Sequence, residues 1–388
     1  MPQVNDLSRS LVALDQDSTV IAVIEMGLTG WLVAGIVPGV HRHPLKKIAP
    51  DQELLLQVLQ RWRQEAEGAG KSIKRIAVAS EAGRDGFWLA RWLRARGIEA
   101  YVIHPSSVPV TRERRRAKTD RLDTELLKRA FLGWLRGEPD HCSMAAIPTL
   151  EDEDAKRPGR ERENLTGERT RIINRIKAAL VRLGIRNFNP KLRNAPQCLD
   201  TLCTPEGAAI PPNTLAELRR DMARLSLVKQ QIKDIEAARI EDLRQAPGDQ
   251  RQEMVRSLMR VVGVGIETAD MLVQEVFSRN LRDRKAVARY AGLTGAPDES
   301  GKKRRERGLA KSGNARVRRG MIQLAWGFLQ HQKDSQLAAW YRARTAEAPR
   351  GTRKTMIVAL ARKLLITLWR LATAGEVPES LALRAVTR

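Results

Sequence analysis

Two kinds of hydrophobic pattern alternate along the first 140 residues. Short β-branched runs bounded by glycine or proline alternate with stretches in which hydrophobic residues recur at helical spacing. The expected strands cover 19–25, 31–37, 73–80 and 98–104, and the expected helices cover 51–69, 85–96 and about 120–136. A hairpin followed by strand–helix alternation predicts an α/β domain with a mixed sheet and helices packed on it.

Helical spacing dominates the rest of the chain. Two long polar helices, at about 161–184 and 214–245, are separated by a proline-rich segment and predict an antiparallel helical or coiled-coil arm. Further helices are expected at 285–293, about 315–331 and 352–374, with a loop at 294–314. The predicted domains are therefore 1–140, 141–250 and 251–388, and the last is mostly α-helical.

Charge narrows the class of partner. The 388 residues carry a formal net charge of +24, and a protein this basic usually meets a polyanion, with nucleic acid as the default. Aromatic residues make up only 4%, which disfavours a protein that stacks single-stranded bases. No hydrophobic run is long enough to span a bilayer and no signal peptide is evident, so we expect a cytoplasmic protein without a membrane partner.

Four carboxylates are the strongest candidate for chemistry. Asp120 and Asp123 lie three residues apart at the start of a predicted helix and therefore share one of its faces. Glu25 and Glu81 end two predicted strands, where α/β proteins place their ligands. Together they could hold two Mg²⁺ ions for phosphodiester chemistry. The alternative for each acid is a solvated strand end or a first-turn residue favoured by the helix dipole.

Two further patterns suggest contact with phosphates. Gly263 and Gly265 lie between helical segments, as in a helix–hairpin–helix, where backbone N–H groups can hold a DNA phosphate. The alternative is an ordinary turn between helices. A basic segment nearby also predicts nucleic-acid contact, although a solvated charge cluster remains an alternative. Its expected contact residues are Lys302, Lys303, Arg304, Arg305 and Lys311.

The ordered set of motifs resembles a known family, the DEDD insertion-sequence transposases of the "IS one-ten" family, which are related to the Piv invertase. The N-terminal motifs are IAVIE (21–25), VASEAGRDGFWLARWL (78–93), GIEAYVIHP (97–105) and AKTDRLDTELLKR (117–129). The C-terminal motifs are VVGVGIETADML (261–272), VARYAGLTGAPDESG (287–301) and GLAKSGNARVRRGM (308–321). The resemblance covers most of the chain apart from the arm and the tail.

The resemblance implies a DNA recombinase with a RuvC-like (RNase H-like) N-terminal domain. Such an enzyme excises and inserts its element with a bridge RNA that pairs with donor and target DNA. The family tetrad would be Glu25, Glu81, Asp120 and Asp123, although the family usually has aspartate at the first position. The family's serine nucleophile corresponds to Ser300 in DESG, and Ser312 in KSGN is the rival.

These expectations leave two other functions open. A Holliday-junction-type nuclease would use only the carboxylates, metal and water, and a non-enzymatic nucleic-acid-binding protein would use none of the five residues catalytically. For the recombinase we further expect a homo-oligomer, a dimer or tetramer, with the tetrad and Ser300 in one composite site. Its expected location is the nucleoid of a prokaryotic cytoplasm.

Overall fold

The computed structural model divides the chain into two compact units, residues 1–151 and 152–388. It describes residues 9–10, 12–83, 85–108, 120–138, 141–245, 248–279, 281–300, 303–310, 312–347, 349–377 and 379–384. Within these ranges only the backbone is described at 106, 120, 297–300, 303–307 and 350. We describe each unit by itself, and the domain boundaries expected near residues 140 and 250 stay predictions.

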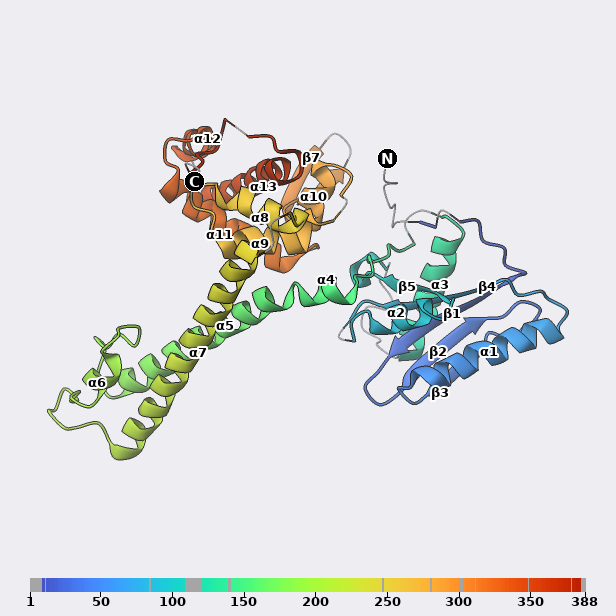
Figure 1. The fold of residues 1–388 in the computed structure, drawn as a ribbon, viewed down its shortest axis with the longest axis horizontal. Coiled ribbons are helices and arrows are strands. Elements are labelled where there is room, and N and C mark those ends of the chain that lie inside the picture. The colour runs from blue at the N-terminus through green and yellow to red at the C-terminus, as the bar shows by residue number, and fades with distance from the viewer. Residues whose placement is uncertain are drawn as a thin grey trace. The chain divides into compact units, whose positions relative to one another are not determined.

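The N-terminal unit is built on a five-stranded mixed sheet (Figure 1). Its strands are β1 (Thr19–Met26), β2 (Trp31–Ile36), β3 (Leu45–Ile48), β4 (Arg75–Glu81) and β5 (Glu99–Ile103). The order is β3-β2-β1-β4-β5, with β1 antiparallel to β2 and parallel to β4. The mixed sheet is as predicted, but β3 was missed because its short, mostly exposed LKKI sequence carries no alternating pattern.

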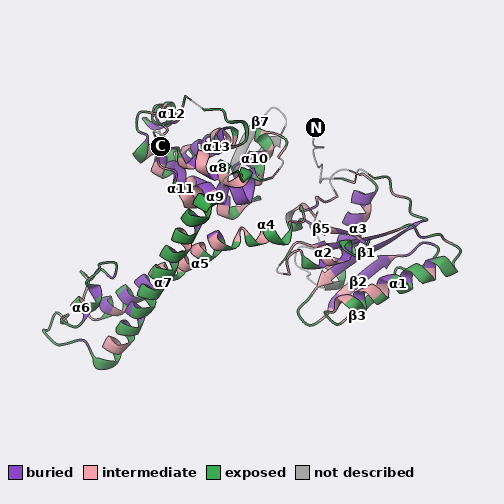
Figure 2. Ribbon diagram, viewed as in Figure 1, coloured by how far each residue is buried: buried purple, intermediate pink, exposed green. Residues whose placement is uncertain are grey.

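Helices cover both faces of this sheet. They are α1 (Gln52–Gly68), α2 (Trp88–Arg94) and α3 (Asp120–Leu135), with a short 3₁₀ turn η1 (Pro105–Ser107). The even-numbered residues of β1, such as Ala22 and Ile24, pack with α1 and α2. The odd-numbered residues, such as Ile21 and Val23, pack with α3. Because side chains alternate along a strand, the two cores lie on opposite faces of the sheet, and Figure 2 shows the strands as largely buried.

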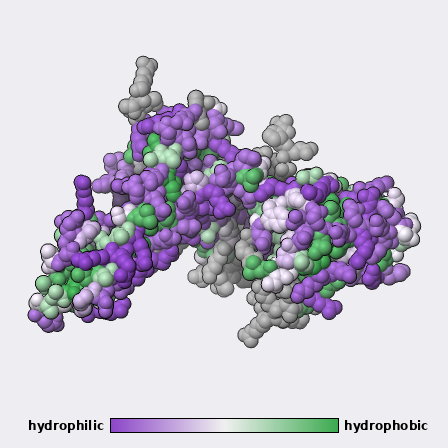
Figure 3. Space-filling view, turned by 60° about the horizontal axis from the view of Figure 1, so that its bottom comes forward, coloured by the Kyte–Doolittle hydropathy of each residue, from purple (hydrophilic) through white to green (hydrophobic). Residues whose placement is uncertain are grey.

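Two long helices of the second unit, α5 (Arg157–Arg182) and α7 (Pro212–Gln245), occupy the region predicted as an arm, and the coiled coil stays a prediction. They pack along each other around a core that includes Ile176, Leu218 and Leu225. A short helix α6 (Ala195–Leu199) lies in the connecting segment, and α4 (Leu150–Asp154) precedes α5 in the chain. Figure 3 shows hydrophobic residues exposed toward the tip of this arm.

The remainder of the second unit is mostly helical, as predicted. Its helices are α8 (Gln250–Met259), α9 (Ile266–Leu272), the π-helix η3 (Val273–Phe277), α10 (Arg284–Tyr290), α11 (Ala315–His331), α12 (Gln336–Thr345) and α13 (Arg350–Ala374). Leu360, Leu364 and Leu368 of α13 are buried at its centre with Met321 and Phe328 of α11. None of the described helices is long and hydrophobic enough to cross a membrane.

The segment expected to be a loop, 294–314, is instead largely a β-hairpin. Strand β6 (Gly295–Ser300) pairs antiparallel with β7 (Lys303–Leu309), so the loop prediction was wrong. The segment lacks the hydrophobic alternation that marks a half-buried strand. Its register instead sets acidic positions opposite basic ones, with Asp298 facing Arg305 and Glu299 facing Arg304, a pairing that favours neighbouring strands.

Candidate active site

The sheet register brings two of the predicted carboxylates to neighbouring positions. Ile24 of β1 pairs with Ser80 of β4 in the parallel ladder. Glu25 and Glu81 are the next residue on each strand, and both remain within the strand bounds. Parallel neighbours lie about 4.8 Å apart in the hydrogen-bonding direction. The two glutamates therefore stand side by side where β1 and β4 approach their carboxyl ends.

Strand alternation also fixes the face on which these glutamates lie. Glu25 continues the series of Ile21 and Val23, which pack in the core under α3. Glu81 likewise continues the series of Ala77 and Ala79, which belong to the same core. Since residues two apart share a face, both glutamates belong to the side of the sheet covered by α3. Both are half-buried.

The direction of α3 is set by contacts along its length. The ring of Trp134, near the end of α3, lies 5.0 Å from the ring of Tyr101 in the middle of β5. Ala130, one turn nearer the start of α3, accepts a weak hydrogen bond from Cys142 Sγ at 3.5 Å. The next residue, Ser143, accepts a hydrogen bond from the backbone N–H of His104, which lies just past the end of β5. We infer that α3 starts toward the carboxyl ends of the strands.

The first turn of α3 carries the two predicted aspartates. Asp120 is its first residue, and Asp123 stands one turn before Leu127, which is 3% exposed in the core between helix and sheet. Residues four apart share a helix face, so Asp123 lies on the side of α3 that packs on the sheet, where it is half-buried. The side chain of Asp120 is outside the described part of the structure.

These residues suit a hard divalent cation. All four predicted ligands offer carboxylate oxygens, which Mg²⁺ and similar ions prefer. Two stand side by side on the α3 face, and the other two begin the helix on that face. Among the described side chains, which exclude Asp120, no three His, Cys, Asp or Glu residues form a group poised to hold a metal ion. The four-carboxylate metal site therefore stays a prediction.

The predicted nucleophile lies in the second unit. Ser300 is the last residue of β6, opposite Lys303 at the closed end of the hairpin. Only the backbone is described at Ser300 and at the predicted contacts Lys303, Arg304 and Arg305, and both Lys302 and Lys311 lie outside the described residues. The rival serine, Ser312, is exposed beyond the other end of β7. The two serines therefore occupy opposite ends of the hairpin.

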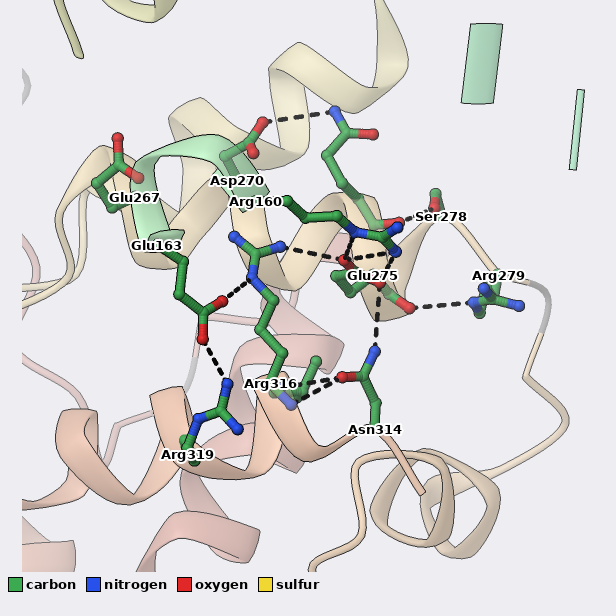
Figure 4. A network of polar contacts seen from close by, with 12 residues as sticks. Arg160, Glu163, Glu267, Asp270, Glu275, Ser278, Arg279, Asn314, Arg316 and Arg319 are labelled. Atoms are coloured by element: carbon green, nitrogen blue, oxygen red, sulfur yellow. Dashed lines mark hydrogen bonds and ion pairs between the residues drawn. The ribbon is translucent and has the colours of Figure 1, made fainter. Parts of the chain in front are cut away.

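A polar network anchors the chain just after this hairpin (Figure 4). Asn314 caps α11 by accepting the N–H groups of Arg316 and Val317, and its amide donates to Glu275 Oε2 at 3.2 Å. Arg316 Nη1 lies 3.1 Å from Glu275 Oε1, and Arg160 of α5 lies 3.2 Å from the same oxygen. The buried Glu275 thus joins the arm, the π-helix η3 and the start of α11.

Electrostatics keep Glu275 charged. Burial alone would raise the pKa of its carboxyl, because only 3% of the side chain is exposed. The cations Arg160 and Arg316 outweigh burial, and the pKa lies below its ordinary value. The sequence patterns did not predict the network formed by Asn314, Arg316 and Glu275. Only the pattern Gly-Asn before α11 signalled a helix cap there.

The two glycines of the predicted DNA-contact hairpin occupy different environments. Gly263 has φ +89°, and a Cβ added there would lie 3.3 Å from His331, so the turn requires glycine. Gly265 is exposed and caps α9. The carboxylate of Glu267 already occupies the first turn of α9 and accepts a hydrogen bond from Arg239 at 2.7 Å. The turn is present, and its contact with a phosphate stays a prediction.

Comparisons with known proteins agree on one family. Residues 40–185 match the DEDD transposase family of IS110, described as Transposase, and residues 255–342 match the Transposase IS116/IS110/IS902 family. A protein of Sinorhizobium fredii (strain NBRC 101917 / NGR234), named "Putative transposase y4rJ", is 38% identical over 371 residues, which cover 93% of each chain. The chain therefore belongs to the IS110 family of DEDD transposases and is a DNA transposase.

Proposed function

We propose that this transposase cuts and rejoins DNA during excision and insertion of an insertion sequence, using a serine–DNA intermediate at Ser300 and an acidic metal site. The observation that carries the metal site is the register that places Glu25 beside Glu81 on the sheet face under α3. Asp120 and Asp123 complete the set from the first turn of that helix. The same arrangement supports a RuvC-like N-terminal domain.

The four carboxylates would hold a divalent cation close to the DNA phosphate. When bound, Mg²⁺ neutralises charge that develops on the attacked phosphate and on the leaving oxygen. Glu25 and Glu81 supply ligands from a rigid sheet, whereas Asp120 and Asp123 supply them from the start of a helix. Glu25 is one methylene longer than the aspartate usual in the family, and it would still offer a carboxylate to the cation.

Ser300 supplies the covalent step. Its Oγ loses a proton and attacks phosphorus, so that a serine–phosphate bond forms while one phosphate–deoxyribose bond breaks. The departing deoxyribose oxygen takes up a proton and leaves as a hydroxyl. A deoxyribose hydroxyl then attacks the phosphoserine, restores a phosphodiester and frees the serine. The basic positions 302–305 next to Ser300 stabilise the negative charge on the phosphate.

The partners follow from the family and from the charge. The protein acts on double-stranded donor and target DNA, and a bridge-type guide RNA selects the sites. A net charge of +24 supports binding to both nucleic acids. We further propose a dimer or tetramer joined through the helical arm, where Val181, Leu192 and Leu227 expose 45%, 55% and 60% of their surface.

The test is to trap the intermediate. The wild-type protein, Ser300→Ala, Ser312→Ala and Asp120→Ala are incubated with Mg²⁺, element DNA and the RNA that co-purifies with the protein, and protein–DNA adducts are separated under denaturing conditions. We expect an adduct with the wild type and Ser312→Ala, none with Ser300→Ala, and little with Asp120→Ala.

Other outcomes separate the alternatives. An adduct that persists in Ser300→Ala would remove Ser300 as the nucleophile. Cleavage without any adduct would favour a metal-dependent nuclease that uses water. Binding without cleavage, with the correct RNA and DNA present, would favour a non-enzymatic binding protein. An RNA-free preparation that recombines DNA fully would exclude RNA guidance.

A further inference from the structure

A basic groove lies at the base of the hairpin that carries Ser300. It has a volume of about 890 Å³ and is bounded by α10, by α13 and by the hairpin ends at Gly295 and Ala310. Figure 1 shows α10, β7 and α13 next to one another in the second unit. Six cationic residues line the groove: Arg284, Lys285, Arg289, Arg362, Lys363 and Arg370. None of these residues was among the nucleic-acid contacts expected from the sequence, although Arg289 lies within the motif at 287–301.

The charge of this groove is of one sign. Among the side chains that the structure describes, no aspartate or glutamate lines it, and all six cations are exposed. Among the described residues, none of the six forms an ion pair with a carboxylate, in contrast to cations such as Arg175, Arg239 and Arg316 elsewhere in the same unit. Six neighbouring like charges repel one another, and an anion that binds between them relieves that repulsion.

The groove also has fixed walls. Lys363 Nζ lies 4.8 Å from the ring centroid of Trp340, a distance typical of a cation held over an aromatic face. The hydroxyl-bearing residues Thr294 and Ser312 lie at the hairpin side and add uncharged groups that can contact phosphate. Helix α13 is packed in the central core of the unit through Leu360 and Leu364, so the cations that it carries have a rigid base.

We propose that this groove binds the phosphate backbone of duplex DNA beside the scissile phosphate. The proposal rests on Ser300 as the attacking residue. Gly295 lines the groove and Ser300 ends the same strand, five residues later. At about 3.3 Å per residue the two are roughly 17 Å apart. Phosphates on one DNA strand advance about 3.4 Å per base pair along the helix axis, so the groove meets DNA about five base pairs from the cut.

Position decides between DNA and RNA as the occupant. The strand that leads from the groove ends at the serine proposed to become joined to DNA, so the backbone continuous with the reacting phosphate is DNA. The glycine turn before α9 is a weaker phosphate site, because Glu267 places a carboxylate in the first turn of that helix. The groove, whose described lining has no acid, is therefore the stronger phosphate site of the two.

The experiment compares two triple variants with equal loss of charge. The groove variant is Arg284→Gln with Arg362→Gln and Arg370→Gln. The control is Arg182→Gln with Arg186→Gln and Arg220→Gln, three exposed arginines on the arm. Binding of the full chain to a 40-base-pair DNA duplex of arbitrary sequence, and to a single-stranded RNA of equal length, is measured by fluorescence anisotropy at several KCl concentrations. Thermal unfolding checks that both variants fold as the wild type does.

We expect the groove variant to bind DNA at least about tenfold more weakly near 0.1 M salt, and its log–log salt slope to shrink by roughly 2 to 3. The arm control should change the slope by less than about 1, and RNA affinity should stay within about twofold of the wild type for the groove variant. Unchanged DNA binding by the groove variant would overturn the proposal, and so would a loss of RNA binding equal to the loss of DNA binding.

The outcome is separable from that of the serine chemistry. Ser300→Ala keeps all six groove cations, so it should bind DNA with the wild-type salt slope although it forms no adduct. A wild-type protein that shows the groove-dependent slope but never forms an adduct would refute the nucleophile while supporting the groove. If the wild type forms adducts but the groove variant keeps the wild-type salt slope, the nucleophile would be supported and the groove refuted.

Discussion

Glu25 and Glu81 stand at matched positions on neighbouring parallel strands, one residue beyond the paired Ile24 and Ser80. A one-residue slip of either strand would turn its glutamate to the face covered by α1 and α2. The hydrophobic residues on both faces hold the register, since Ile21 and Val23 are buried under α3 while Ala22 and Ile24 are buried on the other side. The packing of the core therefore determines where the carboxylates lie.

The first prediction concerns Glu25, which lies before the segment 40–185 that matches the DEDD family. Glu25→Gln keeps the size of the side chain but removes a charged ligand, so DNA cleavage should fall by at least about 100-fold. Glu25→Asp restores the residue usual in the family and should retain cleavage within about tenfold of the wild type. The measurement is the rate of adduct formation across a Mg²⁺ titration, in which Glu25→Asp should shift the half-saturating concentration.

Glu53→Gln is the matched control, because Glu53 is an exposed acid on α1 with 57% of its side chain accessible. It should leave the Mg²⁺ dependence unchanged. Equal activity of Glu25→Gln and the wild type would remove Glu25 from the metal site and leave at most three carboxylates in it.

The hydrophobic pattern predicted most of the fold for a physical reason. The β1 and β4 strands are buried on both faces and therefore read as continuous hydrophobic runs, whereas the arm helices bury one stripe each and show helical spacing. The β6–β7 hairpin shows neither pattern, because it is a charged two-stranded ribbon that pairs through its backbone ladder, with acidic positions opposite basic ones in the register. It was therefore predicted as a loop.

Of the candidate site, the positions of two carboxylates in the sheet could be predicted from the sequence, whereas the metal site itself stays a prediction. Glu25 and Glu81 end buried strands, and that position is visible in the sequence. The Glu275 network was not predictable, because its partners Arg160 and Arg316 lie 115 and 41 residues away and no local pattern links them. The groove at α10 and α13 was hidden for the same reason, since its cations come from segments about 80 residues apart.

Cys142 provides a chemical test of how the segment after α3 packs. Burial raises the pKa of the Cys142 thiol to about 12, and the residue is only 4% exposed. Cys203 is exposed and Cys198 is half-buried. Since the thiolate is the reactive form, Cys142 should react with a disulfide reagent at about pH 8 on the order of 1,000-fold more slowly than Cys203.

The reaction is followed by absorbance of the released aromatic thiol, before and after addition of guanidinium. A Cys203→Ser variant identifies the fast phase. Three equally fast thiols in the folded protein would show that Cys142 is not buried against α3.

Asp221 should stabilise the arm by joining its two helices. Its carboxylate is 2% exposed and accepts two hydrogen bonds from Arg175 at 2.6 Å, and a third from Arg224 at 2.9 Å. Asp221→Asn should lower the opening free energy of α5 and α7 by about 1–2 kcal/mol, a modest figure because both arginines are about half exposed. Native-state hydrogen exchange of the arm amides measures this change.

Asp200→Asn is the control, because Asp200 and Arg219 are both about half exposed and their pair should contribute less than about 0.5 kcal/mol.

The hydrogen bonds from Arg175 lower the pKa of Asp221 below its ordinary 3.8. Its stabilising contribution is therefore complete above that pH and is lost as the pH falls toward the folded-state pKa. Equal exchange in the two variants would contradict the role of Asp221.

Glu275 should control how firmly the start of α11, and the hairpin before it, is anchored. Glu275→Gln removes a buried charge and leaves Arg316, whose side chain is only 17% exposed, with Glu163 as its remaining carboxylate partner. We expect Glu275→Gln to lower the free energy of unfolding by about 2–4 kcal/mol, since removal of one partner from a buried ion pair is strongly destabilising. Glu163→Gln, which removes a carboxylate that is 40% exposed, should cost less than about 1 kcal/mol.

The stabilisation that Glu275 provides should depend on pH. The folded-state pKa of Glu275 lies below its ordinary 4.5, so the wild type binds fewer protons at that group when folded than when unfolded. The stabilisation is complete above about pH 4.5 and is lost as the pH falls through the folded-state value. Below that pH, the thermal unfolding temperature of the wild type should therefore fall more steeply on acidification than that of Glu275→Gln. Parallel pH profiles for the two proteins would show that Glu275 is not held charged by Arg160 and Arg316.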